Sequence, residues 1–147
     1  MPRYLRDGKI DMTLLMQDFQ VFWRDNGAIW QERYDYKEAA PHLILMAFLQ
    51  RIINGGGSIT REMAAERKRL DLCVEYLGHK YPIELKLNER PETLNKGLEQ
   101  LARYMDTLGC TEGWLVLFDR RPDVDWSEKL YLKTETAGDK HITVVGC

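Results

Sequence analysis

Residues 69–87 have the sequence RLDLCVEYLGHKYPIELKL, and this stretch contains the features that decide the fold. Two apolar runs flank Gly78, which is the pattern of an antiparallel hairpin. Asp71 interrupts the first run, and Glu84 and Lys86 interrupt the second. The first question is therefore which face of the hairpin carries each charge.

We expect the turn at Gly78–His79, because glycine suits the first central position of a two-residue type II′ turn. Asp71 then falls opposite Lys86, and Cys73 falls opposite Glu84. Side chains alternate along a strand, so Asp71, Glu84 and Lys86 share one face. A register shift of two residues keeps this result, whereas a shift of one residue scrambles it. The other face is apolar and consists of Leu70, Leu72, Val74, Tyr76, Ile83, Leu85 and Leu87.

Two carboxylates that converge from adjacent strands repel each other, unless a cation compensates them. Mg²⁺ prefers carboxylate oxygens and keeps several of its waters. Lys86, beside such a site, could contact a phosphate oxygen or the attacking water, and these are the parts of metal-assisted phosphodiester hydrolysis. The alternative is a surface-facing sheet in which Asp71 and Lys86 form a weak cross-strand ion pair.

The rest of the chain predicts a mixed α/β domain, with a central sheet covered by helices. Helical spacing predicts an amphipathic helix that ends near Gly27, and a second helix with Pro41 in its first turn. A third helix is expected to stop at Gly109. In chain order the predicted elements are helices at 11–27 and 36–54, a strand at 59–64, the hairpin, a helix at 92–109, a buried strand at 112–119, and two strands joined by a Gly-Asp turn within 129–147.

Composition limits the classes of function. The chain has 147 residues and a formal net charge of −2, so we expect one domain without a global attraction to nucleic acid. Local basic patches occur at Arg67–Arg69 and around Lys86. Three cysteines without CxxC spacing favour a reducing compartment. The N-terminus lacks a signal-peptide core, and no apolar stretch is long enough to span a bilayer, so we expect a cytoplasmic protein that does not enter a membrane.

Asp71 on one strand, followed by Glu84-Leu85-Lys86 on the next, resembles the PD-(D/E)XK nuclease superfamily, whose fold is called restriction-endonuclease-like. The stretches EAAPHLILMAFLQRIINGGGSITREMAAERKRLDL, IELKL, GLEQLARYMDTLG and GWLVLFDRR are together similar to the nuclease-like domain found C-terminal to an AAA-type ATPase domain in bacterial proteins. The resemblance covers residues 36–147, which we take as the nuclease-like domain, and residues 1–35 form an N-terminal helical segment.

The resemblance implies an α/β restriction-endonuclease-like fold and a Mg²⁺- or Mn²⁺-dependent nuclease that acts on DNA. Asp71 and Glu84 would bind the metal, with the Leu85 carbonyl as a further candidate ligand, and Lys86 would position or activate the water. Glu38 matches the helix glutamate that many members direct at the metal.

Gln100 and Tyr104 match a Gln-xxx-Tyr motif of exonuclease-type members, and their i, i+4 spacing places both on one helix face. An ordinary polar helix edge would explain this pair equally. Glu38 could instead favour the helix dipole. Glu62 and Glu66 are alternative accessory ligands, although solvated or ion-paired roles suit them better.

Two features depart from the family pattern. Pro82, two residues before Glu84, removes a ladder hydrogen bond and predicts irregular or edge-like pairing. No G-x-x-x-x-G-K-[ST] motif is present, so the chain would be a stand-alone copy or an excised domain. The competing function is a non-catalytic nuclease-fold module that binds nucleic acid or docks onto an AAA-type ATPase partner.

Overall fold

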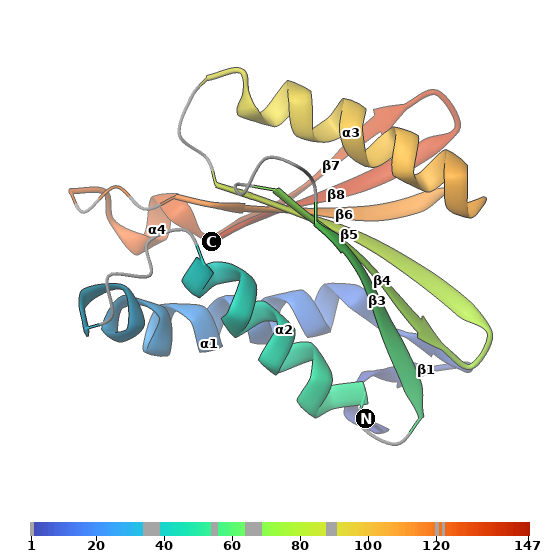
Figure 1. The fold of residues 1–147 in the computed structure, drawn as a ribbon, viewed down its shortest axis with the longest axis horizontal. Coiled ribbons are helices and arrows are strands. Elements are labelled where there is room, and N and C mark those ends of the chain that lie inside the picture. Colours follow the sequence, from blue (N-terminus) through green and yellow to red (C-terminus); the bar gives the residue numbers. More distant parts are fainter. Residues whose placement is uncertain are drawn as a thin grey trace.

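The computed structural model describes residues 2–33, 39–53, 56–63, 69–87, 91–119, 121 and 123–147. After a short N-terminal hairpin, two helices precede three consecutive strands, and the remaining helices and strands follow (Figure 1). They are η1 (Pro2–Tyr4), β1 (Leu5–Arg6), β2 (Lys9–Ile10), α1 (Met12–Arg33), α2 (Ala39–Ile53), β3 (Gly57–Met63), β4 (Arg69–Tyr76), β5 (His79–Leu87), α3 (Thr93–Leu108), β6 (Glu112–Phe118), α4 (Trp126–Lys129), β7 (Tyr131–Ala137) and β8 (Lys140–Gly146).

The central sheet has six strands in the order β3-β4-β5-β6-β8-β7. β3, β4 and β5 form an antiparallel meander, and β6 then runs parallel to both β5 and β8. Parallel neighbours need a crossover connection, and α3 supplies it between β5 and β6. The expectation of a mixed α/β domain with a mixed central sheet is therefore confirmed.

Helices cover both faces of this sheet. α3 lies across one face, and α1 and α2 lie against the other (Figure 1). The α1–α2 side buries the larger core cluster, which includes Phe19, Trp23 and Leu45 together with Ile83 and Leu85 of β5. The α3 side buries a smaller cluster of Leu101, Met105, Leu115, Leu117, Ile142 and Val144. β6 contributes to both clusters, as its continuous apolar sequence predicts for a strand buried on both faces.

The hairpin at 69–87 forms, but its turn differs from the prediction. Leu77 and Gly78 are the two central residues, with φ of 50° and 81°, because Tyr76 pairs with His79. Two positive φ angles are the signature of a type I′ turn, whose twist matches that of the strands. The expected type II′ turn at Gly78–His79 is wrong, and the register is shifted by two residues.

Glycine is predicted to end two of the helices, and it ends only one of them. α3 ends at Gly109, which adopts the left-handed conformation with φ 73°, as predicted. α1 does not end near Gly27 but continues to Arg33. Glycine in a helix interior costs only about 1 kcal/mol relative to alanine, so a helix that packs against the core, as α1 does, can include it. Pro41 occupies the first turn of α2, where its missing N–H is tolerated.

The N-terminal segment packs into the larger core cluster. Leu15, Met16 and Phe19 of α1 are among its fully buried residues. The β1–β2 hairpin is tied to the sheet, because the Ile10 N–H donates a hydrogen bond of 2.8 Å to Tyr81 Oη. None of the described helices combines the length and the apolar character needed to cross a bilayer.

Candidate metal and phosphate site

Asp71 and Glu84 are direct partners in the β4–β5 ladder. The same register pairs Arg69 with Lys86, and Cys73 with Pro82. The predicted pairs Asp71–Lys86 and Cys73–Glu84 are therefore wrong. The shift is of two residues and side chains alternate with period two, so Asp71, Glu84 and Lys86 still share one face.

Pro82 does not disturb the ladder. The β4–β5 pairing runs without a break from Arg69 and Lys86 to Tyr76 and His79. Pairing of β5 with β6 begins only at Ile83, so Pro82 lies beyond that ladder. A strand position with one paired neighbour tolerates a residue without an N–H.

The three charged side chains are buried on the side of the sheet where α3 packs against β5. Asp71 is 4% exposed, Glu84 is 0% exposed and Lys86 is 7% exposed. A weak surface ion pair requires exposed side chains, so the surface-facing alternative does not describe this hairpin. Burial of a charged side chain costs free energy unless other groups compensate the charge. These three side chains therefore need compensation that the apolar residues of the sheet do not need.

Lys86 is held against α3. Its Nζ donates a hydrogen bond of 3.0 Å to Oε1 of Gln100. The helix approaches closely because residue 97 is glycine: a Cβ there would lie 2.9 Å from Cδ2 of Leu115 and 3.4 Å from Cδ of Lys86. The family resemblance implies a site role for Gln100, and in the structure Gln100 contacts Lys86 directly.

Of the other predicted site residues, the structure describes Tyr104 but not Glu38. Tyr104, one helical turn after Gln100, is half-buried and packs against the smaller core cluster. Glu38 and Glu66 lie outside the described residues, as do Arg67 and Lys68. The role expected of Glu38 as a third metal ligand stays a prediction.

The register adds one position to the site. Glu62 of β3 is the partner of Asp71, which is in turn the partner of Glu84. Three acidic positions therefore form one row across β3, β4 and β5. The sequence alone leaves Glu62 a secondary candidate, because the length of the connection between β3 and β4 does not fix their register.

The carboxylates of Asp71 and Glu84 are donors of the kind that suits Mg²⁺ or Mn²⁺. Carboxylate oxygens are the ligands that hard divalent cations prefer, and Mg²⁺ usually uses one or two of them while it retains waters. Asp71 and Glu84 supply these groups from adjacent strands. Within the described ranges, no group of three or more His, Cys, Asp or Glu side chains gathers as a metal cage.

Cys73 shares the charged face but is not suited to nucleophilic chemistry. Burial raises the pKa of its thiol, and the nearby Glu75 carboxylate raises the pKa further. The thiol therefore stays protonated at neutral pH, and only a thiolate is an effective nucleophile.

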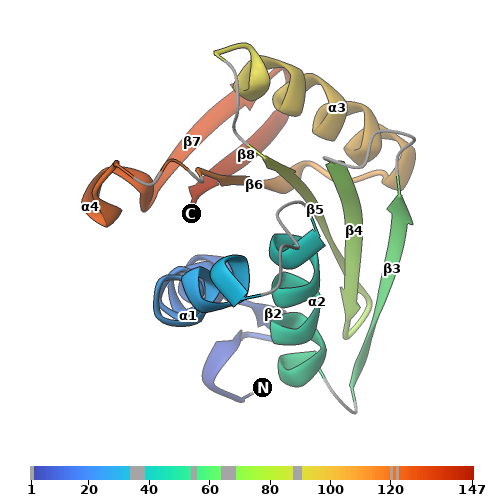
Figure 2. The same cartoon turned by 60° about the vertical axis from the view of Figure 1, so that its left-hand side comes forward.

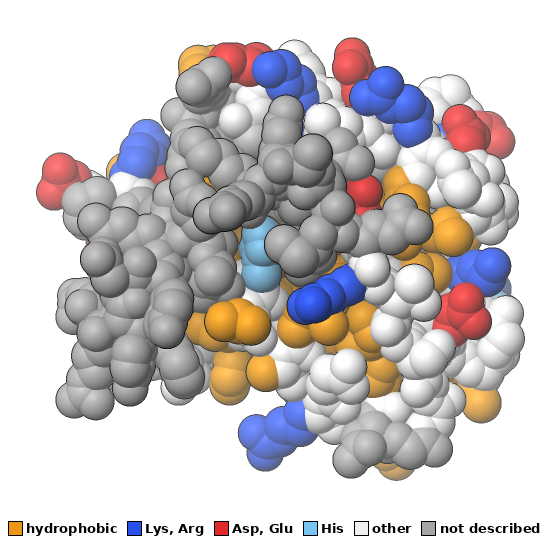
Figure 3. All heavy atoms as spheres, viewed as in Figure 1, with side chains coloured by type: hydrophobic (Ala, Val, Ile, Leu, Met, Phe, Trp, Pro, Cys, Tyr) orange, Lys and Arg blue, Asp and Glu red, His pale blue; other side chains and the backbone are white. Residues whose placement is uncertain are grey.

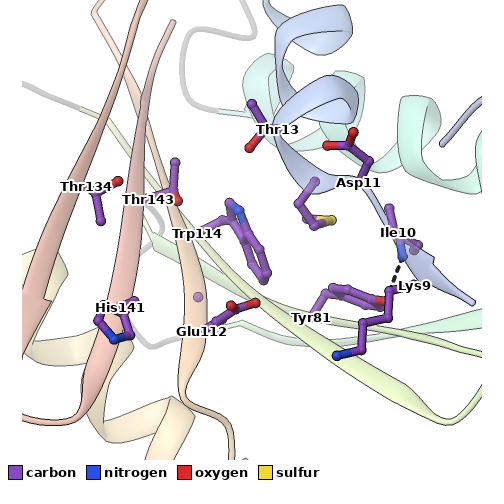
Figure 4. A pocket seen from close by; sticks show the side chains of 12 residues that line it. Lys9, Ile10, Asp11, Thr13, Tyr81, Glu112, Trp114, Thr134, His141 and Thr143 are labelled. Atoms are coloured by element: carbon purple, nitrogen blue, oxygen red, sulfur yellow. Dashed lines mark hydrogen bonds between the residues drawn. The ribbon is translucent and has the colours of Figure 1, made fainter. Parts of the chain in front are cut away.

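A separate cavity of about 370 Å³ opens on the opposite face of the sheet (Figure 4). It lies between the N-terminal hairpin, the start of α1 and the first residues of β6. Trp114 and Tyr81 form its aromatic side, with ring centroids 5.9 Å apart. None of Asp71, Glu84 and Lys86 lines it, so the charged cluster and this cavity are distinct.

Comparisons of the chain with protein-family models, with curated proteins and with solved structures find no match.

Proposed function

We propose that this chain is a divalent-metal-dependent nuclease with a restriction-endonuclease-like fold, and that it hydrolyses DNA phosphodiester bonds. The observation that carries the proposal is the direct pairing of Asp71 with Glu84, with Lys86 on the same covered face. Two carboxylates next to a buried lysine combine a cation-binding group with a phosphate-binding group.

Each residue has a role in the proposed reaction. Asp71 and Glu84 would hold Mg²⁺ or Mn²⁺, and the bound cation would supply Lewis-acid chemistry to the phosphate and the attacking water. Lys86 donates hydrogen bonds from its ammonium group to a non-bridging phosphate oxygen and offsets the charge that develops in the transition state. Gln100 orients Lys86 through the contact between Oε1 and Nζ.

DNA is the proposed polymer because of the family resemblance. The face in Figure 3 mixes acidic and basic side chains where its residues are described, without a patch of one sign. The proposal therefore does not rest on an extended basic stripe of the kind that binds duplex DNA. The support comes from the local site, where one phosphate would meet a cation and Lys86. An AAA-type ATPase domain remains the proposed partner on the same resemblance.

Cleavage by matched variants tests the proposal. Plasmid and single-stranded DNA are incubated with the protein and Mg²⁺ or Mn²⁺, with and without a chelator. Glu84→Gln preserves shape but removes the ligand charge, and Glu75→Gln makes the same change at an exposed position of β4. We expect cleavage by the wild type and by Glu75→Gln, metal dependence in both, and a loss of at least a hundredfold in Glu84→Gln. Equal cleavage by the two variants would exclude the site.

One observation favours a second function. Glu84 is fully buried and Asp71 nearly so, and a phosphate must reach both in the reaction. A non-catalytic nuclease-fold module that binds nucleic acid or an ATPase partner has no such requirement. If calorimetry detects DNA binding but no Mg²⁺ or Mn²⁺ binding at millimolar concentration, this second function replaces the first.

A further inference from the structure

β7 is the last strand of the sheet, and no described strand pairs with its outer side. Figure 2 shows this edge beside β8, at the end of the sheet away from β3. The middle of the strand is exposed at Lys133 and Thr134, and so is Thr136. A free edge of this kind offers backbone N–H and C=O groups to another strand.

The turn before β8 determines which groups point outward. Gly138 and Asp139 are the central residues, because Ala137 pairs with Lys140. The first and last residues of such a β-turn are joined by a hydrogen bond, so Ala137 is bonded to β8. Bonded and non-bonded positions alternate in an antiparallel ladder. The backbone groups of Leu132, Thr134 and Thr136 therefore face outward.

The charges on this strand are arranged symmetrically around Thr134. Lys133 precedes it and Glu135 follows it, on the same face, with 44% and 40% of their side chains exposed. Their Nζ and Oε1 atoms are 3.8 Å apart. A lysine in the middle of an edge strand normally discourages pairing, because it meets a like or apolar neighbour. Here the glutamate two positions away can compensate it across a two-fold axis.

We propose that β7 pairs antiparallel with β7 of a second copy of this chain, with the two-fold axis at Thr134. Lys133 then lies opposite Glu135 of the second copy, and Glu135 lies opposite its Lys133. The interface is isologous, and the two central sheets become one continuous sheet.

Charge complementarity selects this register from its neighbours. Centring the axis on Lys133 places the two lysines opposite each other, and centring it on Glu135 places the two glutamates opposite each other. Like charges directly opposite are destabilising in a sheet, whereas opposite charges are favourable. The Thr134-centred register also overlaps all of β7 and pairs the outward-facing residues with one another. Its end pairs set Tyr131 beside Ala137, a large side chain beside a small one.

Sedimentation equilibrium of the full chain over a range of concentrations tests this pairing, at low ionic strength because exposed charges are screened by salt. We expect a concentration-dependent dimer for the wild type. Lys133→Glu alone and Glu135→Lys alone should each raise the dissociation constant roughly tenfold or more, because both replace two attractive pairs by two repulsive ones. The double variant Lys133→Glu/Glu135→Lys should restore the wild-type constant.

Two further variants separate pairing from folding. Thr134→Pro removes an outward N–H, which an edge strand tolerates, and should abolish the dimer while circular dichroism and the thermal midpoint are retained. Lys80→Glu makes the same charge change as Lys133→Glu at an exposed position of β5, and should leave the dimer intact. A wild type that is monomeric at every concentration, a dimer insensitive to Thr134→Pro, or a double variant that fails to dimerise would each overturn the proposal.

Discussion

Nζ of Lys86 on β5 and Oε1 of Gln100 on α3 are joined by a hydrogen bond of 3.0 Å. This contact links a strand of the central sheet to the helix that covers it. It also fixes the direction of the Lys86 side chain, which is 7% exposed. The hydrogen bond to Gln100 already restricts the conformation of the Lys86 side chain. Substrate binding therefore does not have to order this side chain, which lowers the entropic cost of the reaction.

Gln100→Ala should therefore lower the rate of DNA cleavage by roughly ten- to a hundredfold, since small displacements of a catalytic group cost rates of this order. The measurement is a single-turnover cleavage rate at saturating Mn²⁺. Glu99→Ala changes an exposed residue of the same helix and serves as the control. A wild-type rate in Gln100→Ala would show that the contact does not position Lys86.

Gln20→Leu should reduce the free energy of unfolding by about 2–3 kcal/mol, because it leaves one buried and one part-buried carbonyl group without this donor. Nε2 of Gln20 donates to the Tyr131 oxygen at 2.9 Å and to the Gly146 oxygen at 2.7 Å. The bonds thereby connect α1 to the β7–β8 pair. Urea denaturation measures the loss, and Gln17→Leu, exposed on the same helix, should change stability by less than about 0.5 kcal/mol.

Gly146→Ala should destabilise the protein by about 2–3 kcal/mol, since overpacking a rigid site displaces backbone. A Cβ at Gly146 would overlap the ring of Tyr131 and would lie 2.5 Å from the Lys129 carbonyl oxygen. Gly113→Ala is the comparison, because its Cβ would meet Sδ of Met105 at 2.6 Å, and methionine adapts its shape readily. Thermal unfolding should rank Gly146→Ala as clearly the more damaging, and the reverse order would contradict this packing.

Asp18→Asn should remove stability at neutral pH but not in strong acid. The hydrogen bond from Arg3 is the main cause that lowers the pKa of Asp18 below its ordinary value of 3.8, and a bond from Tyr4 also lowers it. A carboxyl group whose pKa falls on folding stabilises the protein above the unfolded value, and that contribution is lost as the pH drops through the folded value.

The free energies of unfolding of the wild type and Asp18→Asn should therefore differ at pH 7 and converge below pH 3.8. Urea denaturation across this range measures the difference. Asp25→Asn, an exposed change on the same helix, is the control. A difference that persists unchanged in strong acid would mean that the ionised carboxylate is not what stabilises the N-terminal segment.

The faces of the hairpin were predictable from the sequence, but its register was not. Alternation with period two assigns Asp71, Glu84 and Lys86 to one face in either register. The register depends on which residues accept positive φ, and Leu77 does so with φ 50°. A non-glycine residue in this conformation is uncommon, so local sequence favours the wrong turn.

The N-terminal hairpin escaped prediction because two-residue strands carry no periodic signal. The Asp7-Gly8 pair was nevertheless available as a turn signal, and both residues have positive φ in the structure. The contacts of Gln20 and the close approach at Gly97 depend on tertiary packing. No local pattern in the sequence indicates that these residues face a strand.

The most direct test of the proposed site is the single-turnover rate of DNA cleavage by Lys86→Ala at saturating Mn²⁺, with Mn²⁺ binding measured on the same sample. Lys86 is proposed to act on the phosphate, whereas Asp71 and Glu84 would hold the cation. We therefore predict that Lys86→Ala binds Mn²⁺ as the wild type does but cleaves at least a hundredfold more slowly. Cleavage by Lys86→Ala at the wild-type rate would contradict the account.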